Sequence, residues 1–452
     1  MDVKNKKIVV AGLGKTGFDS AVFLARKGAD IFLTEEKATE QISKDASLLN
    51  EKGIKTEIGG HTEEFIKDME MLVVSPGIPD DALPVRYAES RNIPVISEIE
   101  LAFTFSPSKK IIAITGTDGK TTTTSLTGHI FKEAKVPSVV CGNIGNTFIG
   151  EIDKIQRETF VILEVSSFQL ERIKEFKPLL GCLLNIDEDH IDRHRTIENY
   201  IGAKKRLFIN QDSNDRAVLN YEDKWCRDIA RTIKSKKFFF GRDEFHKQGV
   251  YLKNNIIFSA LNKEKHTKVV NIEKTNLWGK GNAENMMAAS LIALLCGIDA
   301  EAIERAISGF IPLPHRLERV AEKNGVLFIN DSKSTSPHSV INALESVETE
   351  TILIMGGRNK DMSFSRIIPY FKNKVRLIIL LGEAKDMLAE EFKECGVPVI
   401  KVNDVKEAVQ NAFKNAKPGD IVLFSPGCTS FDMFNNYKER GDAFKKEVLS
   451  LL

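Results

Sequence analysis

The stretch Lys109–Thr124, KKIIAITGTDGKTTTT, decides the fold of the central part of this chain. Its apolar segment Ile111–Ile114 predicts a short buried strand, and the glycine-containing turn after it leads into a threonine-rich helix that begins at Lys120. In this order, N–H groups of the turn and of the helix start point toward a triphosphate, Lys120 adds a positive charge, and Thr121 offers a hydroxyl to Mg²⁺. The stretch therefore predicts a nucleotide-binding loop formed by Gly116, Thr117, Asp118, Gly119, Lys120, Thr121 and Thr122.

The spacing of the two glycines departs from the usual phosphate-binding pattern. That pattern has four residues between its glycines. Here only Thr117 and Asp118 separate them, and Ile114 stands where the first glycine is expected. A glycine-rich turn without a ligand is therefore the alternative, but the order strand, turn, lysine, threonine and helix favours nucleotide binding.

Length and composition describe an ordinary globular protein of two or three domains. The chain has 452 residues, of which 42% are hydrophobic and 28% are charged. A formal net charge of +1 provides no attraction for nucleic acid or an anionic membrane, so we expect neither partner. The six cysteines form no CxxC pair, which favours reduced thiols over disulfides or zinc ligands. Because no signal-peptide pattern or membrane-length apolar run is present in the sequence, we expect a cytoplasmic protein without membrane insertion.

Strands and helices alternate in three sections, which predicts an α/β protein with three domains and parallel sheets. We place the domains at 1–106, 107–312 and 313–452, with Ser106-Pro107-Ser108 as the first linker. Beyond Ile111–Ile114, the predicted strands are Lys7–Ala11, Ile31–Leu33, Met71–Val74, Val95-Ile96, Phe160–Val165, Leu180–Ile186, Ala217–Asn220, Val326–Ile329, Thr351–Met355, Leu377–Leu381, Val399–Val402 and Ile421–Phe424. A helix is predicted from about Asn282 through Leu295.

The first section opens with a turn typical of dinucleotide-binding domains. The motif GLGKTG, Gly12–Gly17, follows the first strand, and Glu35 and Glu36 follow the second. By itself this pattern leaves nicotinamide binding and another nucleotide-linked ligand as open alternatives. Because a phosphate-binding loop follows downstream, we favour a nucleotide-bearing substrate. The tight loop Ser75-Pro76-Gly77 is suited to face the same ligand.

Two segments that follow apolar strands predict a site for a hard metal ion. Glu164 lies at the end of a predicted strand, where a Mg²⁺ ligand belongs beside a phosphate loop; the alternative is that it caps a turn with Ser166. His190 and His194 stand one helical turn apart, as a zinc pair would, but no third zinc ligand is evident. We therefore expect His190 to serve a hard metal and His194 to be exposed.

Together these motifs resemble the ATP-dependent Mur ligases of peptidoglycan synthesis, most closely the type that adds D-glutamate. The matching motifs are GLGKTG, SPGIP, GTDGKTT, GNIGN, EVSSFQL, NIDEDHIDRH, AKKR, GNAEN, LPHRLE, NDSKSTS, GGRNKD and SPGCTSFDMF, in this order along the whole chain. A dozen motifs in register are far more specific than any one of them. The resemblance implies a Rossmann-like N-terminal domain, a central P-loop-type ATPase domain with a parallel sheet, and a Rossmann-like C-terminal domain.

The resemblance also implies the reaction and its participants. An ATP-dependent, ADP-forming acid–amino-acid ligase would join D-glutamate to UDP-N-acetylmuramoyl-L-alanine through an acyl phosphate, with Mg²⁺ and as a monomer. Lys204 would be carbamylated, because a carbamate turns a lysine into a carboxylate-like Mg²⁺ ligand beside Glu164 and His190. Without the resemblance, Lys204 reads as part of a basic surface helix.

Residue roles follow from the resemblance position by position. The catalytic residues would be Lys120, Glu164, His190 and Lys204, and the metal ligands Thr121, Glu164, His190 and carbamylated Lys204. Further contacts to ATP would come from Asn282, Asn285, Arg316 and Asp331. The UDP-substrate would meet Gly14, Lys15, Thr16, Thr34, Glu35, Ser75, Pro76, Gly77, Asn143 and Ser166. D-glutamate would meet Lys333, Thr335, Lys360, Ser430 and Phe431.

Some positions depart from the family pattern. Gly281 stands at the histidine of the adenine-side motif, Thr34-Glu35 stand where some relatives carry Asp-Thr beside uracil, and Tyr437 stands in place of a phenylalanine. These departures bear on individual nucleotide-edge contacts and leave the reaction intact. The alternatives are another Mur ligase or a folylpolyglutamate synthase-like ligase and, in a different class, a nicotinamide-dependent dehydrogenase.

Overall fold

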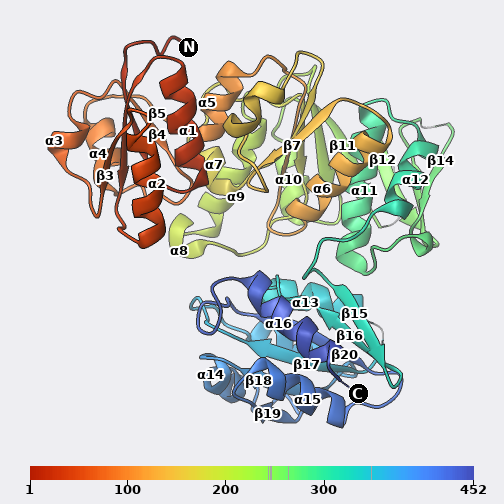
Figure 1. Ribbon diagram of the computed structural model, residues 1–452. Helices are drawn as coiled ribbons and strands as arrows, with labels where there is room; N and C mark the ends of the chain where they lie inside the picture. The colour runs from red at the N-terminus through yellow and green to blue at the C-terminus, as the bar shows by residue number, and fades with distance from the viewer. Residues whose placement is uncertain (243, 245–246, 263, 348, 452) are drawn as a thin grey trace. The chain divides into compact units, whose positions relative to one another are not determined.

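Three mainly parallel sheets, each accompanied by helices, form the protein (Figure 1). The computed structural model describes residues 1–242, 244, 247–262, 264–347 and 349–451, without the side chain of residue 192. One compact unit, Met1–Asn271 with Asn285–Ile307, holds the first and central sheets, and a second, Ile272–Glu284 with Ser308–Leu452, holds the third. The α/β class with three domains, predicted from the sequence, is confirmed.

The first sheet has the strand order β3-β2-β1-β4-β5, and all its neighbours are parallel. Side chains of β1 alternate between two cores, with Ile8 and Val10 on one face and Val9 and Ala11 on the other. Figure 1 shows α1 and α2 on one face and α3 and α4 on the other, the layering of a Rossmann-like domain. The elements are β1 (Lys7–Ala11), α1 (Lys15–Arg26), β2 (Asp30–Glu35), α2 (Glu40–Asn50), β3 (Lys55–Ile58), α3 (Glu63–Ile66), β4 (Met71–Val74), α4 (Leu83–Ser90) and β5 (Val95–Ser97).

The central sheet has the order β14-β13-β12-β11-β10-β9-β6-β8-β7. Its strands are β6 (Ile111–Thr115), β7 (Ser138–Gly142), β8 (Phe160–Glu164), β9 (Leu180–Leu183), β10 (Arg216–Asn220), β11 (Lys236–Gly241), β12 (Gly249–Lys253), β13 (Ile256–Ser259) and β14 (Thr267–Asn271). Pairing is parallel from β7 to β12, whereas β12, β13 and β14 pair antiparallel. The sequence predicted β6, β8, β9 and β10 of the parallel part, and it missed β7 and this antiparallel edge.

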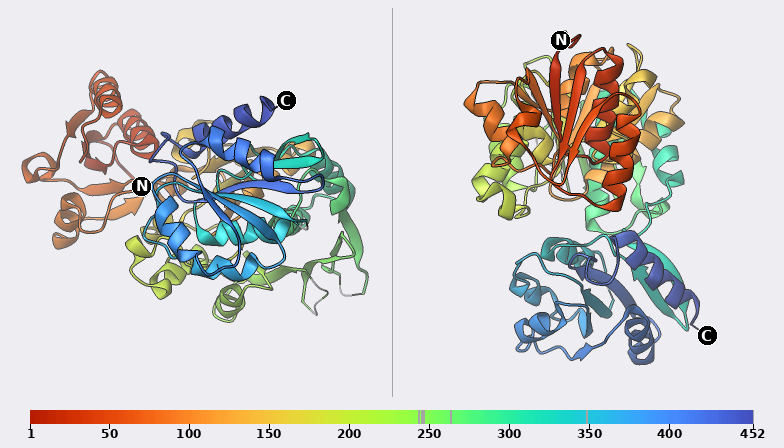
Figure 2. Two further views of the ribbon diagram at one scale, coloured as in Figure 1. Left: turned by 90° about the horizontal axis from the view of Figure 1, so that it is seen from below. Right: turned by 60° about the vertical axis from the view of Figure 1, so that its left-hand side comes forward.

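The third sheet has the order β15-β16-β20-β17-β18-β19, in which only β15 is antiparallel to its neighbour. Leu353 and Met355 of β17 point to one core, and Ile352 and Ile354 to a second core on the opposite face. Figure 2 gives two further views of this sheet and its helices. The elements are β15 (Glu318–Lys323), β16 (Val326–Asn330), α13 (Pro337–Ser346), β17 (Thr351–Gly356), η4 (Ser365–Tyr370), β18 (Val375–Leu381), α14 (Lys385–Glu391), β19 (Val399–Lys401), α15 (Val405–Asn415), β20 (Ile421–Gly427) and α16 (Tyr437–Leu449).

The remaining helices connect or cover the strands of the first two sheets. They are α5 (Glu98–Phe105), α6 (Lys120–Glu133), η1 (Ile149–Lys154), α7 (Ser167–Glu171), α8 (Ile191–His194), α9 (Ile197–Lys205), η2 (Arg206–Phe208), α10 (Lys224–Ala230), η3 (Ile272–Lys274), α11 (Lys280–Leu295) and α12 (Ala300–Gly309). Within the part of the chain that the structure describes, no helix has both the length and the apolar character that crossing a membrane requires.

The connection between the first and central sheets is buried. Ser106 and Ser108 are 6% and 0% exposed, and the Ser108 hydroxyl donates to the Thr159 carbonyl at 2.7 Å. Just before this connection, the Glu100 carboxylate accepts backbone N–H bonds from Lys174, Glu175 and Phe176 at 2.8–2.9 Å. The predicted linker is therefore a fixed joint that holds the two sheets in one compact unit.

Candidate active site

The predicted phosphate loop lies between β6 and α6, at the carboxyl end of the central sheet. Because β9, β6 and β8 are adjacent and parallel, the loops that follow them meet at one edge. The carboxamide of Asn185, from the loop after β9, accepts N–H bonds from Thr117 and Asp118 at 3.0 and 2.8 Å. Asn185 thus holds the turn in the shape that presents the start of α6.

Glycine at position 119 is required by both conformation and space. Its φ of 80° lies in the left-handed region, which other residues adopt at a cost. A Cβ there would also lie 2.2 Å from the side-chain oxygen of Asn285, an oxygen that accepts a bond from the Thr123 hydroxyl at 3.1 Å. Asn285, predicted on the ATP side, therefore lies directly against the phosphate loop.

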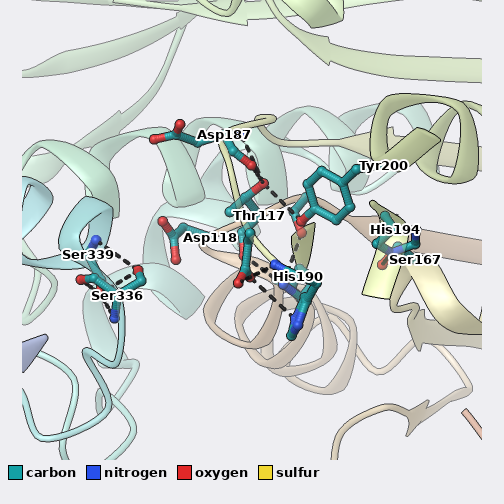
Figure 3. A network of polar contacts seen from close by, with 12 residues as sticks. Thr117, Asp118, Ser167, Asp187, His190, His194, Tyr200, Ser336 and Ser339 are labelled. Atoms are coloured by element: carbon teal, nitrogen blue, oxygen red, sulfur yellow. Dashed lines mark hydrogen bonds and ion pairs between the residues drawn. The ribbon is translucent and has the colours of Figure 1, made fainter. Parts of the chain in front are cut away.

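Thr117 is hydrogen-bonded at the centre of a polar network (Figure 3). Its hydroxyl lies 3.1 Å from the Tyr200 hydroxyl, donates to the Asp187 carbonyl at 3.2 Å and accepts the Asp187 N–H at 3.0 Å. The loop after β6, the loop after β9 and helix α9 are thereby linked. This network orders the part of the chain that carries His190 and Lys204.

Glu164 ends β8 with a carboxylate that is only half satisfied. Its Oε1 accepts a bond from the Asn143 side chain at 3.0 Å, whereas its buried Oε2 has no hydrogen-bond partner. The residue is 2% exposed. The turn-capping alternative does not hold, since the Ser166 hydroxyl forms a capping box with Gln169. A buried carboxylate oxygen without a partner is costly, and a bound cation would satisfy it.

The two histidines of HIDRH have different surroundings. His194 is 5% exposed, with Nε2 3.0 Å from the Ser167 hydroxyl and Nδ1 3.2 Å from Glu171 (Figure 3). Both of its ring nitrogens are engaged, so the expectation that His194 is exposed is wrong, and a zinc pair with His190 is disfavoured. His190 is the N-cap residue of α8, with a left-handed φ of 54°, and its Nε2 lies 3.4 Å from Asp189.

Lys204 lies inside the protein, on the last turn of α9. It is 1% exposed, and its ammonium donates to the Gly116 carbonyl at 2.7 Å. The Lys120 ammonium donates to the same carbonyl at 2.9 Å and to the Thr117 carbonyl at 2.7 Å. Burial, and then the nearby Lys120 charge, hold the pKa of Lys204 well below the usual lysine range. The basic surface helix is therefore excluded for Lys204.

The donors near the phosphate loop suit Mg²⁺ better than a transition metal. No group of three His, Cys, Asp or Glu residues arranged for a metal occurs among the described residues. Glu164 nevertheless offers an unpartnered carboxylate oxygen, and Thr121 stands in the first turn of α6. Mg²⁺ uses few protein ligands and takes oxygens from phosphates and water as well. The residues present therefore fit a Mg²⁺–nucleotide complex.

The predicted UDP-substrate residues of the first sheet gather at the carboxyl ends of β1, β2 and β4. A Cβ at Gly17 would lie 1.8 Å from the Gly12 carbonyl, so the turn before α1 requires glycine there. The Glu35 carboxylate accepts the Leu13 N–H at 2.8 Å, and Thr34 is fully buried with its hydroxyl 2.7 Å from His61 Nδ1. Both side chains at the departure from the Asp-Thr pattern thus support the local structure.

Other predicted contacts extend this region toward the central sheet. The Lys15 ammonium donates to the Gly145 carbonyl at 2.9 Å, which links α1 to the loop after β7. Asn143 comes from that same loop, and Ser166 is the N-cap residue of α7. Ser75, Pro76 and Phe168 line a crevice of the same compact unit. Gly14 and Gly77 lie in the adjoining turns after β1 and β4, and Thr16 lies in the first turn of α1.

The predicted D-glutamate residues lie on three loops of the third sheet. These loops follow β16, β17 and β20, which are adjacent and parallel. Arg358 and Thr429 pair through backbone bonds of 2.9 and 3.0 Å, which brings the loop of Lys360 beside the loop of Ser430. Lys360 and Phe431 are exposed, whereas Ser430 is 3% exposed.

The loop after β16 is fixed by buried polar groups. The Asp331 carboxylate accepts bonds from the Leu317 N–H at 3.1 Å, from the Ser425 hydroxyl at 3.0 Å and from the Ser334 hydroxyl. Burial raises the pKa of Asp331 to about 6. The Lys333 ammonium lies 4.2 Å from the Tyr437 ring centroid. Tyr437 thus provides an aromatic face for a predicted substrate lysine.

The remaining predicted ATP-side residues belong to the second compact unit. The Asn282 side chain donates to the Trp278 carbonyl at 2.9 Å in the first turns of α11. Arg316 lies between His315 and Leu317, whose φ values of 65° and 46° are left-handed. Thr335, which was predicted on the D-glutamate side, also belongs to this unit. It directly precedes Ser336, which forms a capping box with Ser339 at the start of α13 (Figure 3).

Comparisons with known proteins give the chain a family. The model for the MurD-like N-terminal domain matches residues 6–97, the Mur ligase middle domain 114–293, and the Mur ligase, glutamate ligase domain 315–428. A Caldicellulosiruptor bescii protein named UDP-N-acetylmuramoylalanine--D-glutamate ligase is 42% identical and covers 100% of this chain and 99% of its own length. This chain belongs to the Mur ligase family. A protein of the same name from Clostridioides difficile strain 630 is 40% identical, with 100% of both chains covered.

Solved structures of other Mur-type ligases share the fold. UDP-N-acetylmuramate-alanine ligase MurC from Thermotoga maritima superposes with a TM-score of 0.61 at 17% identity, over 98% of this chain and 99% of that one. MurF ligase from the same organism, solved in complex with ADP, gives 0.61 at 17% identity, over 99% and 96%. A pseudomurein peptide ligase type C from Methanothermus fervidus gives 0.63 at 18% identity, over 98% and 100%.

Two residues of this Mur ligase site were missed by the sequence analysis. Asn185 shapes the phosphate loop, and Tyr200 fixes Thr117. Asn185 carries a usable signal, since it is the first polar residue after the apolar run of β9. Tyr200 carries none, because an aromatic residue on a short helix is usually part of the core.

Proposed function

We propose that this chain is an ATP-dependent, ADP-forming ligase that adds D-glutamate to UDP-N-acetylmuramoyl-L-alanine in peptidoglycan precursor synthesis. The observation that carries the proposal is the unpartnered, buried oxygen of Glu164 beside a lysine-bearing phosphate loop. It occurs in a chain whose full-length relatives are named for this ligation. A carboxylate that needs a cation, next to a triphosphate-binding loop, is what phosphoryl transfer requires.

The chemistry begins with a carboxylate that is a poor electrophile. The substrate carboxylate attacks the γ-phosphoryl group of ATP, ADP leaves, and the resulting acyl phosphate is attacked by the D-glutamate amine to give an amide and phosphate. Lys120 and the N–H groups at the start of α6 neutralise negative charge that develops on the phosphoryl oxygens. Mg²⁺, held by Thr121, Glu164 and His190 with carbamylated Lys204, would supply further charge neutralisation.

Carbamylation of Lys204 is part of the proposal and is supported by its environment. Only an unprotonated amine attacks carbon dioxide, and the lowered pKa of Lys204 raises the fraction in that form. The product is an anion at a position where a second ammonium, that of Lys120, donates to the same carbonyl. The modification would therefore replace a repulsion between two cations by an attraction.

Selection of D-glutamate is assigned to donors on the three loops of the third sheet. Lys333, Thr335, Lys360 and Ser430 provide charged and hydroxyl donors that suit two carboxylates, and Phe431 follows Ser430 on its loop. D-alanine has one carboxylate, so some of these donors would be left unpaired. We therefore expect D-glutamate to be preferred over D-alanine by roughly a hundredfold or more in kcat/KM.

The decisive experiment measures phosphate release with UDP-N-acetylmuramoyl-L-alanine and a panel of L- and D-amino acids. We expect release only when ATP, the UDP-substrate and D-glutamate are all present. Equal use of D-alanine or L-lysine would identify a different Mur ligase. Fluorescence quenching or enhancement of NADH in place of ATP-dependent ligation would support the dehydrogenase alternative.

We also propose several further properties of this chain. They are the domain boundaries 1–106, 107–312 and 313–452, the monomeric state, the cytoplasmic location, and the roles of Asn282, Asn285, Arg316 and Asp331 toward ATP. Size-exclusion chromatography with light scattering would test the monomer, and the ATP dissociation constants of single alanine variants would test the four residues.

A further inference from the structure

A fork of ion pairs joins the first and central sheets beside the crevice described above. Two nitrogens of the Arg172 guanidinium, at the end of α7, bond Asp80 at 2.7 Å and Glu89 at 2.5 Å. Asp80 lies in the loop after β4, and Glu89 in α4. The Arg172 carbonyl also accepts the Ser97 N–H at 3.2 Å. Arg172, next to α7, thus contacts three parts of the first domain: the loop after β4, helix α4 and strand β5.

A second arginine supports the same carboxylate. The Arg193 guanidinium lies 3.6 Å from Asp80 and 3.5 Å from Glu171. The Arg172 and Arg193 side chains are 22% and 19% exposed, whereas the Asp80 side chain is 62% exposed. The guanidinium groups of Arg172 and Arg193 therefore both hold the exposed carboxylate of Asp80, which restricts the loop from Ser75 to Asp80.

We propose that Arg172 is a positioning residue that sets the distance between the Ser75–Gly77 loop and the start of α7, and so shapes the binding site of the UDP-substrate. This inference rests on the proposed function. Ser75 and Pro76 from the loop after β4, Phe168 and Gln169 from α7, and Arg172 all line the same crevice. The proposed substrate contacts include both the Ser75 loop and Ser166, the N-cap residue of α7.

We attribute the effect of these ion pairs to the orientation that they impose on the two segments, rather than to added stability. Isolated exposed ion pairs contribute little to stability. A planar guanidinium that bonds two carboxylates restricts orientation as well as distance, which an ammonium does not. Arg172→Lys should therefore resemble Arg172→Gln in substrate binding, although it keeps the charge.

The chain offers a matched control for this test. Arg26 of α1 and Asp153 of η1 also form an ion pair between the first and central sheets, at 2.9 Å. Their side chains are 55% and 66% exposed, and neither lines the crevice. Arg26→Gln removes a bond between the same two sheets without touching the fork.

The experiment measures two quantities on the full chain, without ATP or D-glutamate. The first is the dissociation constant of UDP-N-acetylmuramoyl-L-alanine by calorimetry, and the second is amide hydrogen exchange of the Ser75–Asp80 segment in the ligand-free protein. We expect Arg172→Gln, Arg172→Lys and Asp80→Asn each to weaken binding by about fivefold to twentyfold and to speed exchange. The double variant that combines Arg172→Gln with Asp80→Asn should be no worse than either single variant. Arg26→Gln should change neither quantity.

The outcomes separate this inference from the proposed function. If the unaltered chain does not bind the UDP-substrate, the proposed function is wrong, and hydrogen exchange alone decides whether Arg172 orders the loop. Unchanged exchange in all three fork variants, or an equal change in Arg26→Gln, would overturn the positioning role. Arg172→Lys keeps the long side chain and the charge, so it provides a folded variant if Arg172→Gln unfolds.

Discussion

Two lysine ammonium groups lie close together at one carbonyl of the phosphate loop. Lys120 and Lys204 both donate to the Gly116 carbonyl, and Lys204 is nearly inaccessible to water. Two like charges this close in a buried place are unfavourable. Loss of a proton from Lys204 would relieve this repulsion, and so would the proposed conversion of Lys204 to an anionic carbamate.

Lys204→Ala should lose most ligase activity, by about a hundredfold or more, if the carbamate provides a ligand for the metal. Small carboxylates such as acetate should restore part of the activity, because they can occupy the vacated anionic position. Lys204→Arg should not be rescued, since arginine keeps the cation. The assay is steady-state ligation with and without added carboxylate. A fully active Lys204→Arg variant, or an unmodified Lys204 ammonium in well-resolved density from crystals grown with bicarbonate, would refute the modification.

A second buried group gives the free energy of unfolding a pH dependence. Burial raises the pKa of Glu98 to about 7 from 4.5, although Oε1 accepts the Ile149 N–H at 2.6 Å. The folded state holds this proton more tightly, so its contribution is full below pH 4.5 and is lost as pH rises through 7, by up to about 3 kcal/mol. Glu98→Gln should remove this part of the pH slope. Urea unfolding of both proteins from pH 5 to 8 measures it, and parallel curves would contradict the assignment.

At the scale of elements, the joint between the first two sheets depends on α5. Glu100→Gln leaves one acceptor oxygen for three N–H groups, so we expect the free energy of unfolding to fall by about 2–3 kcal/mol. The exposed Glu175→Gln, in the segment that Glu100 binds, should change it by less than about 0.5 kcal/mol. Urea unfolding followed by circular dichroism compares the two. Equal effects would show that the buried carboxylate has no special role.

Which elements the sequence could predict depends on how buried they are. Strands with continuous apolar runs, such as β6 and β17, were found close to their true ends because both faces are covered. The missed β3 and β7 have polar or half-exposed residues, and β7 lies at the edge of its sheet. Periodicity gives little signal for such strands.

The features of the candidate site were also only partly predictable from the sequence. Motifs located the phosphate loop and Glu164 in the sequence, because these positions follow directly from strand ends. Burial of Lys204 and His194 depends on the packing of short helices α8 and α9, which a basic, polar segment does not indicate. Residues that order the site through other side chains, such as Tyr200, are recognised only once the fold brings the segments together.

At the scale of the whole molecule, the proposed assignment of different ligands to different sheets can be tested at Lys120. Lys120→Ala removes the loop cation, so turnover should fall by roughly a thousandfold or more. The dissociation constant of the UDP-substrate should stay within about twofold, because its proposed contacts come chiefly from the loops after β1, β2 and β4. Lys132→Ala, an exposed lysine on the same helix, is the control and should change neither quantity.

The two measurements distinguish a chemical from a structural role for the loop. Lys120 also closes the turn by donating to the Gly116 and Thr117 carbonyls, so a purely structural role would lower the melting temperature and weaken both ligands together. A variant that binds the UDP-substrate normally, melts normally and fails only in ligation would place the charge of Lys120 in the transition state. Near-normal ligation by Lys120→Ala would mean that the triphosphate lies elsewhere, because a reaction with this much developing charge does not proceed unaided once its loop cation is gone.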